Sequence, residues 1–174
     1  IHNKLEFDLK GNLKQKTYYR DSTISFYYIY VYDRNGNNIE FSDYNKEGEI
    51  QWKSQTTYEE KGVMSESKSY DRGDSLRWIT KYEYDNNDQL IKNSVYNLDG
   101  ELQMYWVYEY DKEGNMIQIT EKNAQEDKIQ QMTKRKYDLL GNITESITYD
   151  KEGKETNRYA NVYNEEGLIV QYDA

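Results

Sequence analysis

The sequence predicts an all-β protein: a repetitive antiparallel β-meander of about 12–13 short strands in a curved or spiralling open sheet. Three observations predict this fold. A tyrosine recurs at alternating intervals of 12 and 14 residues, a turn sequence follows it each time, and between turns apolar and polar residues alternate. Composition agrees, because 20 of the 174 residues are Tyr and none is Pro, and Tyr, Thr, Ile and Val favour strands.

The tyrosine ladder defines a repeat of 26 residues that contains two hairpins. Its members are Tyr32, Tyr44, Tyr58, Tyr70, Tyr84, Tyr96 and Tyr110, followed by Lys122, Tyr137, Tyr149 and Tyr163. Backwards along the chain, the ladder extends to Tyr18 and Phe7. Self-similarity at a fixed period is typical of repeat proteins, so we expect residues 1–174 to be a single repeat array.

Each ladder position is followed by residues that favour a tight hairpin turn. One form is Tyr-Asp-x-x-Gly-Asn, as at residues 32–37, and the other half-repeat has a similar Tyr-Asn-x-x-Gly or Tyr-Asp-x-x-Gly form. Asp or Asn accepts hydrogen bonds from backbone amides two residues on, and Gly closes the turn in the left-handed conformation. The predicted turn residues are Asp33, Gly36, Gly48, Gly100, Asp111, Gly114, Asp138, Gly141, Gly153 and Gly167. Asp74 and Asp88 stand where Gly is expected, and Asp tolerates a positive φ.

Between the turns, longer and shorter strands are expected to alternate. The longer strands are expected at residues 24–32, 50–58, 76–84 and 102–110, and each ends at a ladder tyrosine. The shorter, more polar strands are expected around residues 37–44, 89–96, 115–122 and 142–149. Alternation along the longer strands predicts one aromatic face and one more polar face. Apolar exceptions on the polar face indicate that it is partly covered near its middle; they are Ile29, Val31, Ile79, Tyr105 and Val107. Residues 122–128 lack both Tyr and Gly, and an interval of 15 residues follows Lys122, which predicts an irregular turn with one extra residue.

Composition and charge exclude several classes of function. The chain has no Cys, so disulfides, zinc–thiolate sites and thiol nucleophiles are excluded. A net charge of −9 argues against nucleic acid and anionic membrane surfaces as partners. No apolar segment approaches the roughly 20 residues that a membrane-spanning helix needs. Because the sequence begins with Ile1 and within a repeat, we expect it to be part of a longer protein.

No residue pattern indicates catalysis, and we expect neither an enzyme nor a cofactor. The single histidine, His2, is near the start, and no nucleotide-binding loop, nucleophile elbow or metalloprotease motif is present. Asp33, Asn35 and Asn37 resemble a calcium loop in part, but Gly36 is fourth rather than sixth. The hairpin turn explains these residues better, so no metal site is predicted.

The repeat resembles the YD repeat of the RHS family. The resemblance rests on the Tyr-x-Tyr-Asp-x-x-Gly-Asn segments at residues 30–37 and 108–115 and covers residues 7–163. RHS-like proteins are bacterial surface or secreted proteins, so the resemblance implies a secreted or cell-surface bacterial protein. In that family the repeats coil a long β-strip into a shell around a cargo. A unit of 26 residues is longer than a usual YD unit, and so few repeats could not enclose a cargo. MORN-type repeats, which are shorter hairpins used in scaffolds, are a weaker similarity.

The aromatic face is the predicted binding surface. Its residues are Phe26, Tyr28, Trp52, Trp78, Tyr82, Met104, Trp106 and Tyr108. Three functions remain open: a non-catalytic scaffold or adhesion module that contacts proteins, a carbohydrate-binding module in which sugars stack on the tryptophans, and an acidic immunity or antitoxin-like protein. The two edge strands could also pair with flanking repeats or with another chain. Alternatively, the rings have a purely structural role as the core of a one-layer sheet.

Overall fold

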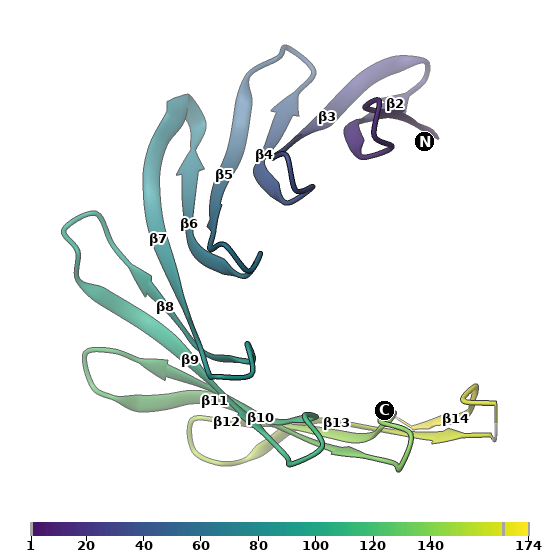
Figure 1. Ribbon diagram of the computed structural model, residues 1–174, viewed down its shortest axis with the longest axis vertical. Coiled ribbons are helices and arrows are strands. Elements are labelled where there is room, and N and C mark those ends of the chain that lie inside the picture. Colours follow the sequence, from purple (N-terminus) through teal and green to yellow (C-terminus); the bar gives the residue numbers. More distant parts are fainter. Residues whose placement is uncertain (1, 165, 174) are drawn as a thin grey trace. The chain divides into compact units, whose positions relative to one another are not determined.

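The computed structural model describes residues 2–164 and 166–173 and confirms the predicted all-β meander (Figure 1). Fourteen strands follow one another in chain order in one open antiparallel sheet, one more than the upper end of the expected range. They are β1 (His2–Phe7), β2 (Leu13–Arg20), β3 (Thr23–Tyr32), β4 (Asn38–Asn45), β5 (Ile50–Tyr58), β6 (Met64–Asp71), β7 (Ser75–Tyr84), β8 (Leu90–Tyr96), β9 (Leu102–Tyr110), β10 (Met116–Asn123), β11 (Lys128–Tyr137), β12 (Ile143–Asp150), β13 (Glu155–Tyr163) and β14 (Ile169–Asp173).

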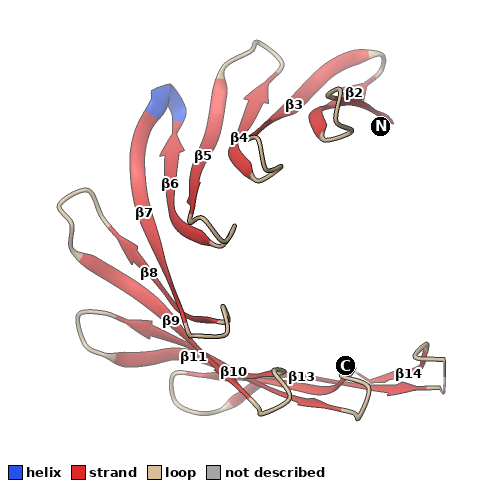
Figure 2. Ribbon diagram, viewed as in Figure 1, coloured by secondary structure: helices blue, strands red, loops and turns tan. Residues whose placement is uncertain are grey.

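The chain divides into two compact units, which we describe separately. Unit 1 contains residues 1–82 and 95–101, and unit 2 contains residues 83–94 and 102–174. Both units consist of strands and tight turns, and one short 3-10 helix, η1 (Arg72–Asp74), connects β6 to β7 (Figure 2).

The repeated turn is held by the aspartate or asparagine that opens it. At the β3–β4 turn, the amide of Gly36 donates to the carbonyl of Asp33 over 3.3 Å, and the Asp33 amide donates to the carbonyl of Asn37 over 3.0 Å. Oδ1 of Asp33 accepts from the amides of Asn35 and Asn37 at 2.8 and 2.9 Å. Gly36 has a φ of 89° and a Cβ built on it would meet no atom within 4 Å, so the backbone conformation alone favours glycine there.

Three connections depart from this turn. The whole β6–β7 connection is Arg72–Asp74, with Gly73 and Asp74 both at positive φ. The β2–β3 connection has only two residues, Asp21 and Ser22, with φ of 49° and 62°, which is the type I′ pattern. In the β10–β11 loop the left-handed residue is Asp127, which comes four residues after the opening Asn123, whereas Gly36 comes three after Asp33.

The short β2–β3 turn makes one ladder assignment wrong. Tyr18 lies opposite Phe26, but its expected counterpart Tyr44 lies opposite Tyr27, on the other face of the sheet. The structural counterpart of Tyr44 is Tyr19, whose ring stacks on His2 with centroids 4.9 Å apart. Because the two-residue turn is shorter than the others, it shifts the strand by one residue, and a shift of one residue moves every side chain to the opposite face.

Ladder tyrosines alternate between the two faces of the sheet. In every strand pair whose register is described, a β-bulge shifts the pairing near the turn, as between Val31 and Tyr32. The tyrosines that end long strands and those that end short strands therefore point to opposite faces, as Tyr32 and Tyr44 do. We call the face that carries Trp52 the aromatic face and the face that carries Tyr44 the second face.

The second face is covered at its centre, as its apolar residues led us to expect. Its middle column holds the small, buried side chains of Thr17, Ser42, Ser94 and Thr120, whose relative exposures are 2%, 1%, 0% and 6%. The larger neighbours of Ser42 on the flanking strands, Ile29 and Lys53, leave it almost no contact with solvent. Among the described hydrophobic residues only Ile147 is buried, so neither unit has a thick aliphatic core.

Candidate binding surface on the aromatic face

A continuous row of rings crosses the aromatic face of unit 1. Ring centroids are 4.4 Å apart for Tyr18 and Phe26, 5.5 Å for Phe26 and Tyr28, 5.3 Å for Tyr28 and Phe41, and 5.6 Å for Phe41 and Trp52. The rings come from four consecutive strands, β2 to β5. These distances are typical of favourable aromatic pairs, so the row is one packed surface that includes the predicted residues Phe26, Tyr28 and Trp52.

The predicted residues Trp78 and Tyr82 lie on β7, further along the same face. Trp52 and Trp78 have relative exposures of 41% and 42%, so each leaves a large part of its indole open to solvent. Tyr82 is half-buried, and this burial, followed by the nearby Tyr58, raises its pKa. Within the described residues, no close ring pair joins Trp78 or Tyr82 to the row.

Met104, Trp106 and Tyr108 lie on the aromatic face of unit 2, on β9. Met104 has a relative exposure of 37%, and Tyr108 donates a hydrogen bond of 2.7 Å to Oδ1 of Asn93 on β8. The eight predicted residues therefore form two sets, Phe26 to Tyr82 in unit 1 and Met104 to Tyr108 in unit 2.

Sequence reasoning missed Phe41 and Asp43, which β4 contributes to the aromatic face. In the strand register Phe41 lies between Tyr30 and Ser54, and Asp43 lies between Tyr28 and Trp52. The feature that places them there is the β-bulge beside Tyr32, because it brings odd-numbered positions of β4 to the same face as even-numbered positions of β3. Alternation counted within a single strand does not reveal this pairing.

Asp43 is the unusual group on this face. Its half-buried carboxylate has no ion pair or hydrogen bond with any residue in the described part of the chain, and burial raises its pKa. Carboxylates that are both desolvated and unpaired are uncommon in strands and often belong to functional sites.

The second face carries tyrosines paired with cations, another feature that sequence reasoning missed. The Lys53 ammonium lies 4.6 Å from the Tyr70 ring centroid and pairs with the carboxylate of Asp74, and Lys81 lies 5.4 Å from the Tyr96 ring. The two tyrosines are one repeat apart, and each pair connects neighbouring strands, so we assign these pairs a structural role.

The irregular β10–β11 loop keeps this pairing with the partners exchanged. Lys122 replaces the ladder tyrosine, and Tyr105 on β9 supplies the ring, 5.7 Å from the Lys122 ammonium. The Tyr105 hydroxyl donates to Asp127, and the Lys122 ammonium lies 3.3 Å from the same carboxylate. The hydrogen bond from Tyr105, followed by that from Lys122, lowers the pKa of Asp127.

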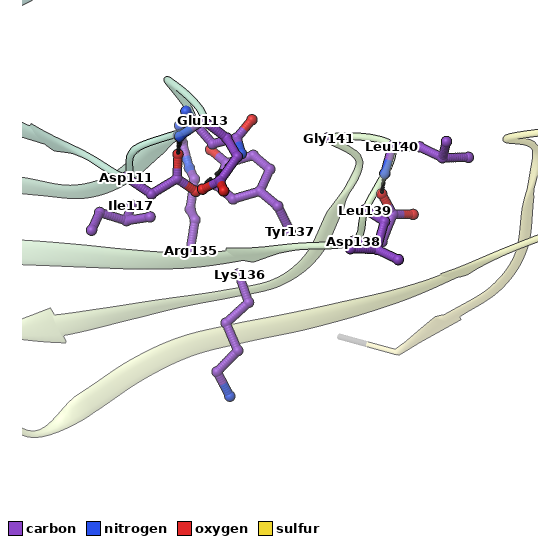
Figure 3. Close-up of a pocket in the computed structure, with 11 residues that line it drawn as sticks. Asp111, Glu113, Ile117, Arg135, Lys136, Tyr137, Asp138, Leu139, Leu140 and Gly141 are labelled. Carbon is purple, nitrogen blue, oxygen red and sulfur yellow. Dashed lines mark hydrogen bonds between the residues drawn. The ribbon is translucent and has the colours of Figure 1, made fainter.

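An open recess of about 910 Å³ lies between the β9–β10 and β11–β12 turns of unit 2 (Figure 3). Arg135 and Tyr137 extend from β11 toward the Asp111 turn, whereas Lys136 points to the opposite side of the strand. Asp111 already accepts hydrogen bonds from Glu113 and Asn115 through its two oxygens. Asp138 is likewise used by its own turn, so both turn aspartates of the recess have structural partners.

The described residues contain no group of three or more His, Asp or Glu side chains placed to hold a metal ion. They also form no helix that is long and apolar enough to cross a membrane.

Comparisons with known proteins give the fold and little more. The model of a protein family of unknown function, DUF2963, matches residues 72–121. No curated protein matches the sequence.

Among solved structures, a TcdB2–TccC3 chain superposes with a TM-score of 0.61 at 14% identity, and the TcdB2–TccC3–Cdc42 structure with a TM-score of 0.59 at 14% identity. Both matches cover 98% of this chain but 9% of the other, so this chain spans about a tenth of those proteins. A porin-like protein from Bacteroides uniformis has a TM-score of 0.54 at 13% identity, over 98% of this chain and 79% of that one.

Proposed function

We propose that this chain is a non-catalytic β-repeat module, similar to RHS-type YD repeats, that acts as a scaffold and protein-binding surface in a bacterial secreted or cell-surface protein. The aromatic row of unit 1 supports this proposal most directly. A row of rings that runs from Tyr18 to Trp52 and remains partly exposed is typical of a surface that contacts another molecule. The structural likeness to β-repeat parts of larger proteins agrees with a scaffold role.

The distribution of polar groups also favours binding over catalysis. Turn aspartates such as Asp33 and Asp111 are hydrogen-bonded within their own turns, and Glu145 is paired with Lys136 and Arg158. A catalytic carboxylate needs to be free and to face a second group across a pocket. Most acidic groups whose contacts are described here have structural roles instead.

The test compares the wild-type chain with a Trp52→Ala, Trp78→Ala double variant. Both proteins are immobilised and exposed to secreted and surface proteins of the source organism, and the retained partner is identified and then titrated as a purified protein. We expect the double variant to lose affinity by at least about tenfold, because exposed tryptophans are frequent centres of protein interfaces. Val31→Ala, at an exposed position of the second face, is the control and should bind as wild type does. Equal affinity of all three proteins would refute the proposal.

A carbohydrate-binding role is the second candidate, and the geometry of the two tryptophans favours it. Trp52 and Trp78 occupy the same repeat position on β5 and β7, two strands apart, which corresponds to about 10 Å. Two flat rings at this spacing could stack on sugars of one linear glycan. A glycan array would distinguish the candidates: binding that depends on both tryptophans favours a carbohydrate ligand, and its absence favours a protein partner.

A further inference from the structure

We propose that Asp43, together with the rings of Tyr28, Phe41 and Trp52, binds a cationic Lys or Arg side chain of a partner polypeptide. This inference rests on the proposed function and identifies the part of the aromatic face that selects the partner.

The first argument is the position of the carboxylate. Asp43 lies directly opposite Tyr28 on one side and Trp52 on the other, and side chains at directly opposite positions have Cβ atoms about 5 Å apart. Phe41, two residues earlier on β4, is on the same face, and its ring contacts both Tyr28 and Trp52. The carboxylate is therefore placed among three rings.

The second argument is electrostatic. The face of an aromatic ring carries partial negative charge and attracts cations, and the carboxylate adds a full negative charge at the same place. No cation of the described chain balances this charge. Lys16 on β2 is on the same face, but its ammonium lies 4.9 Å from the Tyr18 ring and forms no ion pair with Asp43. Three rings and an unpaired carboxylate are the groups from which binding sites for alkylammonium and guanidinium groups are built.

The third argument is access. Trp52 is 41% exposed, so a side chain from solvent can reach the rings beside Asp43. The net charge of −9 also attracts basic polypeptides toward the chain. A long Lys or Arg side chain suits this site, because its methylene groups can lie on the rings while its charged end reaches the carboxylate.

The repeat supplies a second exposed tryptophan that lacks both the carboxylate and the flanking rings, because Ser54, Ser67 and Ser69 stand one repeat after Tyr28, Phe41 and Asp43. Trp78 occupies the position of Trp52 one repeat later and is equally exposed, at 42%. Ser69, instead of an aspartate, lies opposite it. A preference for Trp52 over Trp78 therefore locates the ligand at the ring cluster beside Asp43, and the Asp43→Asn variant tests whether the carboxylate itself is needed.

The experiment is a titration of the ¹⁵N-labelled chain followed by NMR. The three tryptophans give three indole N–H signals, which are assigned from single Trp→Phe variants. The probes are N-acetyl-arginine methylamide and N-acetyl-lysine methylamide, with N-acetyl-citrulline methylamide as a neutral analogue of the first. We expect the cationic probes to shift the Trp52 signal with millimolar affinity, to shift the Trp78 signal at least about fivefold less, and the citrulline probe to have no comparable effect.

Two variants complete the test. Asp43→Asn keeps the shape of the side chain and should weaken binding of the cationic probes by at least about tenfold. Glu40→Gln removes a carboxylate from the same strand on the second face, and it should leave binding unchanged. If Asp43→Asn binds as wild type does, or if Trp52 and Trp78 respond equally, the cation site is refuted. Tighter binding of tetramethylammonium than of either amino-acid probe would also refute it, by indicating a small quaternary ammonium ligand.

The result can be separated from the test of the proposed function. If the tryptophan double variant loses its protein partner while Asp43→Asn keeps full affinity for that partner, the protein-binding role stands and the cation site does not. Loss of the partner in Asp43→Asn, with Glu40→Gln unaffected, supports both.

Discussion

The hydroxyl of Tyr58, the last residue of β5, donates a hydrogen bond of 2.9 Å to the main-chain carbonyl of Asn38, the first residue of β4. Four other long strands end with the same contact to the first residue of the preceding short strand. These pairs are Tyr32 with Leu13, Tyr110 with Leu90, Tyr137 with Met116, and Tyr163 with Ile143, at 3.1, 2.9, 2.7 and 3.0 Å. The ladder tyrosine of a long strand is therefore a connection between neighbouring strands as well as a hydrophobic group.

Replacing Tyr58 with Phe should remove this connection and leave the ring in place. Burial, followed by the charge of Asp33, raises the pKa of Tyr58, so the hydroxyl keeps its proton and remains a donor. We expect a loss of about 0.5–1.5 kcal/mol in the free energy of unfolding and a decrease of about 2–5 °C in Tm, measured by thermal and urea unfolding.

Tyr44→Phe is the matched control. The Tyr44 ring stacks on Tyr27 with centroids 4.9 Å apart, and its hydroxyl has no hydrogen bond with a described residue. The free energy of unfolding should change by less than about 0.5 kcal/mol. Equal losses in Tyr58→Phe and Tyr44→Phe would show that the carbonyl contact contributes nothing.

In six turns the side chains of the first and fifth residues form a hydrogen bond between an acid and an amide. Asp111 Oδ2 accepts a hydrogen bond of 3.0 Å from the side-chain amide of Asn115, whereas the side-chain amide of Asn45 donates a hydrogen bond of 2.8 Å to Glu49. In these six turns an acid at the first position occurs with an amide at the fifth, or an amide with an acid, whereas the turns that open at Glu59 and Asn164 have Val63 and Leu168 at the fifth position. Asp111→Asn alone should cost about 0.5–1.5 kcal/mol, because the amides of Glu113 and Asn115 would then bond to a neutral carbonyl instead of a carboxylate.

The double variant Asp111→Asn, Asn115→Glu should recover most of that loss, because it reproduces the pair found at Asn45 and Glu49. A double-mutant cycle based on urea unfolding measures this coupling. If the two single changes add without recovery, the matching is only a coincidence of sequence.

The sequence was sufficient to predict the class of fold because its signals are local. Tyr32 and Gly36 are four residues apart, and the turn they delimit depends only on backbone conformation and on Asp33. Period-two alternation then gives strands, and short connections give an antiparallel meander. The number of strands differed because β1 and β14 lie beyond the clearest part of the ladder.

The faces of the sheet were harder to predict, because they depend on register between strands. One bulge beside Tyr32 and one short turn at Asp21 decide which side chains share a face. Asp43 could not be assigned to the aromatic face without the bulge, nor Tyr18 without the two-residue turn. Such shifts of one residue leave almost no trace in composition or periodicity.

Acid should destabilise the chain partly through its turn aspartates. The hydrogen bond from Asn115 lowers the pKa of Asp111, and that from Asn142 lowers the pKa of Asp138. A carboxyl group whose pKa is lower in the folded state stabilises the fold above its unfolded pKa, and this stabilisation is lost as the pH falls through the folded pKa.

Asp138→Asn isolates this effect. Its Tm should be lower than that of wild type at pH 7, and the difference should shrink as the pH falls from about 5 to about 2, where wild-type Asp138 becomes protonated. Thermal unfolding at a series of pH values gives the difference directly. A difference that stays constant over this range would mean that ionisation of Asp138 does not contribute to stability.

Ser22→Gly should stabilise the protein at the β2–β3 turn. Ser22 has a φ of 62°, a conformation that is unfavourable for a residue with a Cβ, and Asp-Gly is a preferred pair for a turn of two left-handed residues. We expect a gain of about 0.5–1 kcal/mol in the free energy of unfolding. The control is Ser75→Gly, since Ser75 follows the β6–β7 connection with a φ of −79°, where added backbone freedom should cost about 0.5–1 kcal/mol. Opposite signs for the two substitutions in urea unfolding would support this account of the turn, and a loss of stability in both would contradict it.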